Sequence, residues 1–186
     1  MSNIDVDWVE DYLNEYRQTI FNRRVYRELL EVKKLFEDTN KVGGKIILAG
    51  NGGSAAIASH CSVDLTKNAS IKAINFNEAD LITCFANDYG YEQWISKALD
   101  FYSNDDDIVV LISSSGQSSN ILTAAKKAKQ KNLNLVTFSG FDSTNPLRKE
   151  GKINFWVDSR AYNIVEMTHQ IWLLTIIDML IGASEY

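Results

Sequence analysis

Two loops in this chain carry residue types that suit the binding of a phosphate group. Residues 50–54 are rich in glycine and residues 113–119 are rich in serine. Each loop follows a short apolar run and precedes a helical pattern. The start of a helix presents unpaired N–H groups and a partial positive charge, which favour an anion. Together the loops predict a phosphorylated ligand whose phosphate is held by N–H groups and hydroxyls rather than by a cation.

The glycine loop matches neither the G-x-G-x-x-G pattern nor a Walker loop, which argues against a nucleotide. A tight turn without a ligand is the alternative for this loop, since glycines also permit sharp turns. A flexible connector is the alternative for the serine loop. Flexible connectors seldom lie within a continuous strand–loop–helix unit, so we favour phosphate binding over a connector for the serine loop.

Both histidines of the chain stand one helical turn from a carboxylate. His60 and Asp64 are four residues apart, so they share one face of a predicted helix. Glu166 and His169 are three residues apart on another predicted helix. Such a pair suits two ligands of one metal ion, or a base with the group that orients it. The alternative is a structural histidine with an unrelated carboxylate nearby.

Hydrophobic periodicity divides the chain into two leading helices and then an alternation of strands and helices. Helices are predicted over residues 6–22, 24–40, 54–67, 80–86, 91–102, 119–131 and 162–181. Strands are predicted over residues 45–49, 72–76, 107–112, 133–139 and 153–157. This alternation indicates an α/β fold with a parallel sheet covered on both faces. Ligands bind beyond the carboxyl ends of such strands, where both loops lie.

Two local features complete this pattern. Ser54 has the residue type of a helix N-cap. Asn87 and Asp88 fall in a predicted turn over residues 87–90, because Asn and Asp favour turns through local hydrogen bonds. Their side chains also offer groups that suit substrate hydroxyls.

The composition is that of a soluble globular protein, and 186 residues suffice for one domain with a buried core. The net charge of −5 argues against nucleic acid as a partner. The dense basic cluster is interpreted as a solvated helix face; it consists of Lys126, Lys127, Lys129 and Lys131.

The cysteines and the apolar segments bear on the compartment. Cys61 and Cys84 lack the spacing of metal ligands, and we interpret them as buried free thiols in the cytoplasm. The first residues show no signal-peptide pattern. Residues 171–181 make about half a membrane span and include Asp178, so no membrane partner is expected.

Taken together, these motifs resemble the sugar isomerase (SIS) domain family, in its phosphoheptose isomerase branch. The resemblance rests on the two loops, on His60 and on Asn87 with Asp88, and it covers nearly the whole chain. It implies a flavodoxin-like three-layer sandwich with a five-stranded parallel sheet. It also implies one SIS domain over residues 1–186, with a helical preface at 1–42 and an α/β core at 43–186.

The resemblance also implies an activity and partners. The implied reaction converts sedoheptulose 7-phosphate to D-glycero-D-manno-heptose 7-phosphate and feeds the synthesis of surface lipopolysaccharide. The implied assembly is a homotetramer, with a dimer as the alternative, and its sites lie at subunit contacts. By position, the sugar phosphate is expected to contact Asn51, Gly52, Gly53, Asn87, Asp88, Ser113, Ser114, Ser115 and Ser118.

The chemistry-bearing positions depart from the family pattern. His60 matches the first zinc ligand, but Asp64 stands where the family has a glutamate that serves as ligand and base. On the last helix, Val165 and Leu173 stand where the family has a glutamine and a histidine. We therefore hypothesise that residues 166 and 169 replace them.

The departure leaves several assignments open. Asp64 or Glu166 is the expected base, and His169 or His60 the expected acid. A zinc ion on His60 and Asp64, with Glu166 or His169, is a further expectation. The alternatives to this enzyme are a non-catalytic SIS module that binds a phosphosugar or a protein, and an isomerase or sensor for another phosphosugar.

Overall fold

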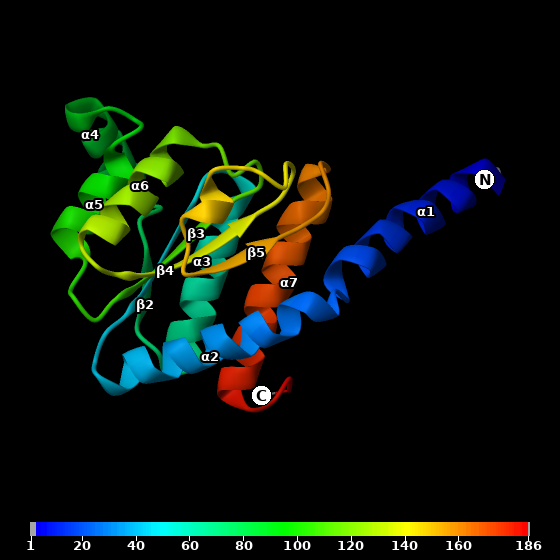
Figure 1. The fold of residues 1–186 in the computed structure, drawn as a ribbon, viewed down its shortest axis with the longest axis horizontal. Helices are drawn as coiled ribbons and strands as arrows, with labels where there is room; N and C mark the ends of the chain where they lie inside the picture. The colour runs from blue at the N-terminus through cyan, green and yellow to red at the C-terminus, as the bar shows by residue number, and fades with distance from the viewer. Residues whose placement is uncertain (1–2, 186) are drawn as a thin grey trace.

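The computed structural model describes residues 3–185, with side chains from residue 5 onward (Figure 1). Its centre is a five-stranded sheet in the order β2-β1-β3-β4-β5, in which every pair is parallel. The strands are β1 (Ile46–Gly50), β2 (Ala73–Asn75), β3 (Ile108–Ser113), β4 (Asn134–Ser139) and β5 (Ile153–Trp156). This is the strand order of a flavodoxin-like sheet, so the predicted fold class is confirmed.

Helices cover both faces of this sheet (Figure 1). They are α1 (Asn3–Ile20), α2 (Tyr26–Lys41), α3 (Gly53–Lys67), α4 (Ala79–Tyr89), α5 (Trp94–Tyr102), α6 (Ser119–Gln130) and α7 (Tyr162–Ile181). Two short 3₁₀ turns, η1 (Arg23–Val25) and η2 (Leu147–Lys149), link some of them. The predicted strands and helices are thus present, most with ends shifted by a residue or two.

Alternation along the strands creates two separate cores. In β1, Ile46 and Leu48 face α2, α3 and α7, whereas Ile47 and Ala49 face α5 and α6. All of these side chains are essentially buried. A strand buried on both faces must be apolar throughout, which is why β1 and β3 read as continuous hydrophobic runs.

The strand order reverses at β1, because β2 lies on one side of it and β3 on the other. The helix after β1, α3, packs in one core, and the helix after β3, α6, packs in the other. The connections after these two strands therefore diverge and leave a crevice between them. Ligands of such sheets bind at this switch point.

Two local predictions are wrong. Residues 87–90 are not a turn, because α4 continues through Asn87 and Asp88 to Tyr89 and ends at Gly90 with a φ of 88°. Ser54 is not an N-cap, because α3 begins one residue earlier. Gly52 occupies the cap position with a φ of 54° and a ψ of −122°, a conformation that disfavours any residue with a Cβ.

The last helix, α7, has the length and mean hydropathy (1.4) of a membrane span. It packs against α1, α2 and α3, and residues such as Ile164, Val165 and Ile176 lie in the core. Its apolar composition is explained by this packing, so α7 is a core helix of the sandwich.

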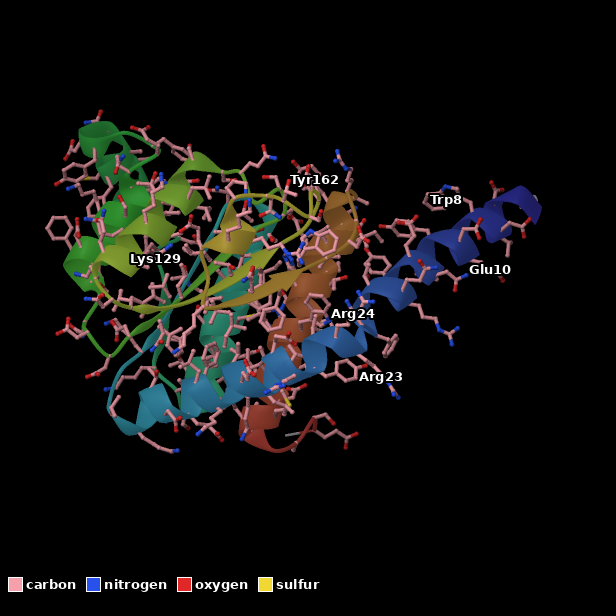
Figure 2. All side chains as sticks on the ribbon, viewed as in Figure 1. Trp8, Glu10, Arg23, Arg24, Lys129 and Tyr162 are labelled. Carbon is pink, nitrogen blue, oxygen red and sulfur yellow. The ribbon has the colours of Figure 1, made fainter. Side chains whose placement is uncertain are left out.

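The first helix, α1, projects away from the sandwich (Figure 1). Hydrogen bonds at its C-terminal end fasten it to α7. Thr19 Oγ1 lies 2.9 Å from Thr168 Oγ1, and Trp172 Nε1 donates to the carbonyl of Ile20 at 3.1 Å. Trp8 extends from the projecting part (Figure 2) and is 64% exposed.

Candidate active site

A cavity of about 270 Å³ opens at the carboxyl ends of β1 and β3. It contains every residue of the two loops that was expected to hold a sugar phosphate. The lining residues are Asn51, Gly52, Gly53, Ser54, Ile112, Ser113, Ser114, Ser115, Ser118, Tyr162 and Glu166. The switch point of the sheet and the two loops therefore coincide.

The glycine loop brings the start of α3 to this cavity. The left-handed turn at Gly52 lets the chain leave β1 and enter α3 at once. The N–H groups of Ala55 and Ala56 donate to the carbonyl of Gly52 at 3.0 and 3.1 Å, so those of the two residues before them are the ones that a ligand can accept. Gly53 meets the carboxylate of Glu166, and a Cβ there would collide with both carboxylate oxygens. The absence of a side chain at Gly53 thus allows the approach of Glu166.

The serine loop folds tightly before α6. The N–H of Gly116 donates to the carbonyl of Ser113 at 3.0 Å, and Gly116 has a φ of 63°. The hydroxyls of Ser113 and Ser118 are 3.2 Å apart, and Ser115 Oγ accepts the N–H of Gln117 at 3.2 Å. This turn gathers several hydroxyls beside the N-terminus of α6. Hydroxyls and helix N–H groups together suit an anion.

Glu166 supplies the carboxylate of the cavity from the first turns of α7. Ser114 Oγ donates to Glu166 Oε1 at 3.5 Å. Burial raises the pKa of Glu166, and the hydrogen bond from Ser114 opposes that shift. A carboxylate with a raised pKa, at the wall of a cavity, has the properties of a general base.

His169 lies outside the cavity, and its assignment as an acid or ligand has to be corrected. Its ring is fully buried beside Phe138 and Trp172, with centroid distances of 5.5 and 6.5 Å. Nε2–H donates to the carbonyl of Ser139 at 3.0 Å. Burial lowers the pKa of His169 to about 4. A neutral, enclosed imidazole cannot exchange protons with a ligand, so His169 is a core residue.

His60 and Asp64 form a pair on the outer side of α3. His60 Nε2 lies 3.1 Å from Asp64 Oδ2, and the amide of Gln170 on α7 lies 3.3 Å from His60 Nδ1. Neither His60 nor Asp64 lines the cavity. Within residues 3–185 no group of three or more His, Cys, Asp or Glu side chains is arranged to hold a metal ion. Two donors do not complete a zinc site, which takes at least three protein ligands.

Asn87 and Asp88 also lie away from the cavity. Both are exposed at the end of α4, where Asn87 Nδ2 donates to Asp88 Oδ1 at 2.9 Å. Asp88 Oδ2 accepts a weak hydrogen bond from Cys84 Sγ at 3.8 Å. Within this chain these side chains bind each other and do not join the glycine and serine loops. Cys84 is exposed, so the prediction of a buried thiol is wrong there and holds for Cys61 alone.

Tyr162 lines the cavity and was not anticipated. It is the first residue of α7, at the upper end of that helix (Figure 2). The Tyr162 and Phe141 rings pack edge to face, with their centroids 4.9 Å apart. Tyr162 precedes Glu166 by four residues, so the same helical spacing that was applied to the histidines would have found it.

The basic cluster of α6 is partly neutralised by neighbours. Lys127 pairs with Asp100 at 3.1 Å, and Lys129 pairs with Glu150 at 2.9 Å. Figure 2 shows Lys129 on the face of α6, on the side of the molecule opposite α1. These pairs agree with the interpretation of a solvated helix face.

With this geometry in place, the chain can be compared with known proteins. Residues 11–140 match the family described as SIS domain, so the chain belongs to the SIS domain family. It is 34% identical over 143 residues to a phosphoheptose isomerase of Sodalis glossinidius, across 72% of this chain and 74% of that protein. It is 41% identical over 107 residues to one of Cytophaga hutchinsonii, across 55% of this chain and 56% of that protein.

Solved structures have the same fold. Phosphoheptose isomerase from Francisella tularensis has a TM-score of 0.85 at 25% identity and covers 97% of this chain and 98% of its own. The enzyme from Neisseria gonorrhoeae has a TM-score of 0.83 at 22% identity, with coverages of 96% and 97%. The Vibrio vulnificus NanR protein, complexed with ManNAc-6P, has a TM-score of 0.57 at 17% identity, with coverages of 97% and 65%.

Proposed function

We propose that this protein is a phosphosugar isomerase that converts sedoheptulose 7-phosphate to D-glycero-D-manno-heptose 7-phosphate. The observation that carries the proposal is one cavity in which the glycine and serine loops meet the carboxylate of Glu166. The relatives named phosphoheptose isomerase support the reaction and the substrate. Aldose–ketose isomerisation needs an anchor for the phosphate and a base for the proton, and the cavity offers both.

Glu166 is the base in this proposal. It removes the proton from C1 of the ketose, which leaves an enediol, and it returns the proton to C2 to give the aldose. A proton must also pass between the oxygens on C1 and C2. Ser114, which donates to Glu166 Oε1 at 3.5 Å, is the hydroxyl best situated to relay it. Burial keeps the pKa of Glu166 raised, which strengthens it as a base.

The test is turnover of sedoheptulose 7-phosphate by the purified chain, with formation of the aldose followed by nuclear magnetic resonance in deuterium oxide. The reaction as proposed incorporates solvent deuterium at C2, because the base exchanges its proton with water. Aldose formation with deuterium at C2 is the expected result. Binding of the sugar phosphate without any turnover would contradict the proposed reaction and leave a binding module.

A shorter phosphosugar is the second candidate, and the position of Glu166 favours it. The carboxylate lies beside Ser114 of the phosphate loop, whereas C1 and C7 of a heptose are at opposite ends of the carbon chain. A heptose 7-phosphate must therefore bend back to bring C1 to Glu166, and a shorter sugar need not. Comparing kcat/KM for pentose, hexose and heptose phosphates decides between the two.

The non-catalytic module is supported by the last helix. Val165 and Leu173 are buried apolar residues, so the positions of the family's glutamine and histidine carry no reactive group. Glu166 in the cavity opposes that alternative. Glu166→Gln distinguishes an isomerase from a binding module. The isomerase loses its turnover, whereas the binding module has no function that depends on a base.

Zinc remains a prediction from the family resemblance. His60 and Asp64 supply two ligands in this chain, and the proposed reaction uses no step that depends on them. Metal content by mass spectrometry, together with turnover before and after chelation, tests it. Stoichiometric zinc whose removal stops turnover would require ligands from another subunit.

We also propose that the protein assembles with copies of itself, as a homotetramer. The projecting α1 exposes Val9 and Leu13, and an apolar groove of about 620 Å³ lies between α2 and α7. Residues such as Leu30, Ile171 and Met179 line the groove. Covering these surfaces would remove apolar area from water. Light scattering on the purified chain measures the assembly, and a monomer would contradict it.

A cytoplasmic location and a role in supplying lipopolysaccharide synthesis follow from the proposed reaction. Deletion of the gene, followed by analysis of the surface polysaccharide for heptose, tests that role. Loss of heptose that is restored by the wild-type chain, and not by a Glu166 variant, is the expected result.

A further inference from the structure

A pair of side-chain amides joins the glycine loop to the start of α6. Asn51 Nδ2 donates to Asn120 Oδ1 at 2.9 Å, and Asn120 Nδ2 donates to Asn51 Oδ1 at 2.8 Å. Because each amide is both donor and acceptor, the two planes have a defined relative orientation. Such a reciprocal pair fixes both partners more strongly than one hydrogen bond would.

The surroundings of the pair leave Asn120 little freedom. Asn120 is 1% exposed, and its Oδ1 also accepts the N–H of Ile121 at 3.0 Å. On the other side, the hydroxyl of Tyr91 donates to Asn51 Oδ1 at 3.2 Å. Breaking the pair would leave buried polar groups without partners, which costs more than the hydrogen bond itself contributes.

The pair lies where the two layers of the fold separate. The pairing of β1 with β3 ends at Gly50 and Ile112, and beyond it α3 and α6 follow opposite faces of the sheet. Asn51 lines the cavity, whereas Asn120 does not. The amide pair therefore connects the glycine loop to the helix that follows the serine loop, across the edge of the sheet.

We propose that Asn120 is a positioning residue for the phosphate site. Through Asn51 it holds the starts of α3 and α6 at the separation at which both can donate to one phosphate group. This inference rests on the proposed function, because it assigns the same cavity to a phosphate. A phosphate bound from two sides requires both helix starts to be in place before binding, and ordering them beforehand lowers the cost of binding.

The test is the dissociation constant of inorganic phosphate, measured by calorimetry on the full chain. Asn120→Ala is expected to weaken binding by about tenfold, since a buried partner loses its hydrogen bonds. Asn51→Ala should weaken binding at least as much, because Asn51 also faces the ligand. The double variant should bind phosphate no more weakly than Asn51→Ala alone, because both changes break the same amide pair. Additive losses would overturn the proposal.

Two further variants separate positioning from folding. Asn75→Ala is the matched control. It also removes an amide hydrogen bond, from Asn75 Nδ2 to Ser62 Oγ (2.8 Å), but neither residue lines the cavity, so phosphate binding should be unchanged. Asn120→Asp keeps the shape of the side chain but cannot donate to Asn51, and its carboxylate repels an anion. It should bind phosphate more weakly than Asn120→Ala. Wild-type affinity in either Asn120 variant, with a lowered unfolding temperature, would overturn the proposal.

Kinetics distinguish this inference from the proposed function. In Asn120→Ala the KM for the phosphosugar should rise by about tenfold while kcat stays within about twofold, because Glu166 is untouched. A fall in kcat at constant KM would overturn the positioning role. If the wild type binds phosphate but turns over no phosphosugar, the proposed reaction fails and the phosphate measurements still decide the role of Asn120. If the wild type binds no phosphate, both proposals fail.

Discussion

The loop side of the cavity presents backbone N–H groups and serine hydroxyls from two continuous stretches of chain, and it is where we propose that the phosphate binds. The α7 side of the same cavity contributes one carboxylate, Glu166, which lies against Gly53 and Ser114 of those loops although it is 52 residues from Ser114 in the sequence. The two histidines that were expected to act as an acid lie elsewhere: His60 is half exposed on α3 and His169 is buried. Binding groups can thus be supplied by loops alone, whereas reactive groups require the right helix face in the right place.

The difference between the loop side and the α7 side of the cavity is sharpest in Glu166→Gln, for which we expect the largest effect. Loss of the base should lower kcat by about a thousandfold. Inorganic phosphate should bind at least as tightly as to the wild type, because a like charge beside Ser114 has been removed. Kinetics and calorimetry on the same preparation measure both. A parallel loss of phosphate binding would mean that Glu166 also serves the phosphate site.

Gly53→Ala should have the next largest effect. The added Cβ would collide with the carboxylate of Glu166 and displace it, and a misplaced catalytic group costs about a hundredfold in rate. Steady-state kinetics measure the loss. The control is the double variant with Glu166→Gln, which should lose no further activity, since Gly53 acts through Glu166. An additional loss would show that Gly53 serves the substrate directly.

Ser114→Ala should reduce turnover at neutral pH by about tenfold. The hydrogen bond from Ser114 lowers the pKa of Glu166, so its removal raises that pKa further. A base works only when deprotonated, and the acid limb of the pH–rate profile should therefore move to higher pH. Ser113→Ala is the matched control, since Ser113 contacts Ser118 and not Glu166. It should weaken phosphate binding without moving the acid limb.

His169→Phe should change stability and not chemistry. The pKa of His169 is lowered to about 4 in the fold from an ordinary value near 6.5, so the unfolded chain binds more protons between these values. The wild type should therefore lose up to about 3 kcal/mol of stability as the pH falls from 6.5 to 4. Urea unfolding across this range measures how the free energy of unfolding changes with pH, and His169→Phe should lack this change. His60→Phe is the control and should show the same pH dependence as the wild type.

His60→Ala should have the smallest effect on turnover. His60 lies outside the cavity and pairs with Asp64 on the surface of α3. The proposed reaction uses neither group, so kcat should stay within about twofold, in the presence or absence of a chelator. A loss as large as that of Glu166→Gln would assign chemistry to His60 and contradict the cavity as the complete site of the reaction.

Much of the fold could be predicted from the sequence because its signals are local. Apolar runs such as residues 108–112 predicted the buried strands, and the alternation with helices predicted the parallel sheet. The glycine and serine loops could be located for the same reason, since each is continuous in the sequence. The errors at residues 54 and 87–90 are also local: single residue types were given more weight than the backbone turns at Gly52 and Gly90.

The separation of Glu166 from His169 could not be predicted in the same way. Their spacing suggests one helix face, yet Glu166 turns to the cavity and His169 to the core between Phe138 and Trp172. The helix α7 is apolar on most sides, so hydrophobic periodicity does not indicate which way it is rotated. The rotation is set by packing against α1, α2 and α3, and by ring contacts with Phe138 and Phe155 of the sheet.

The sequence by itself thus determined the strands, the helices and the glycine and serine loops, because these depend on neighbours along the chain. Only the tertiary structure decided which reactive side chains reach those loops. It brought Glu166 to Gly53 and Ser114, and joined Asn51 to Asn120 across the edge of the sheet. The physical reason is that such contacts join residues distant in the sequence, and their geometry follows from how whole layers pack.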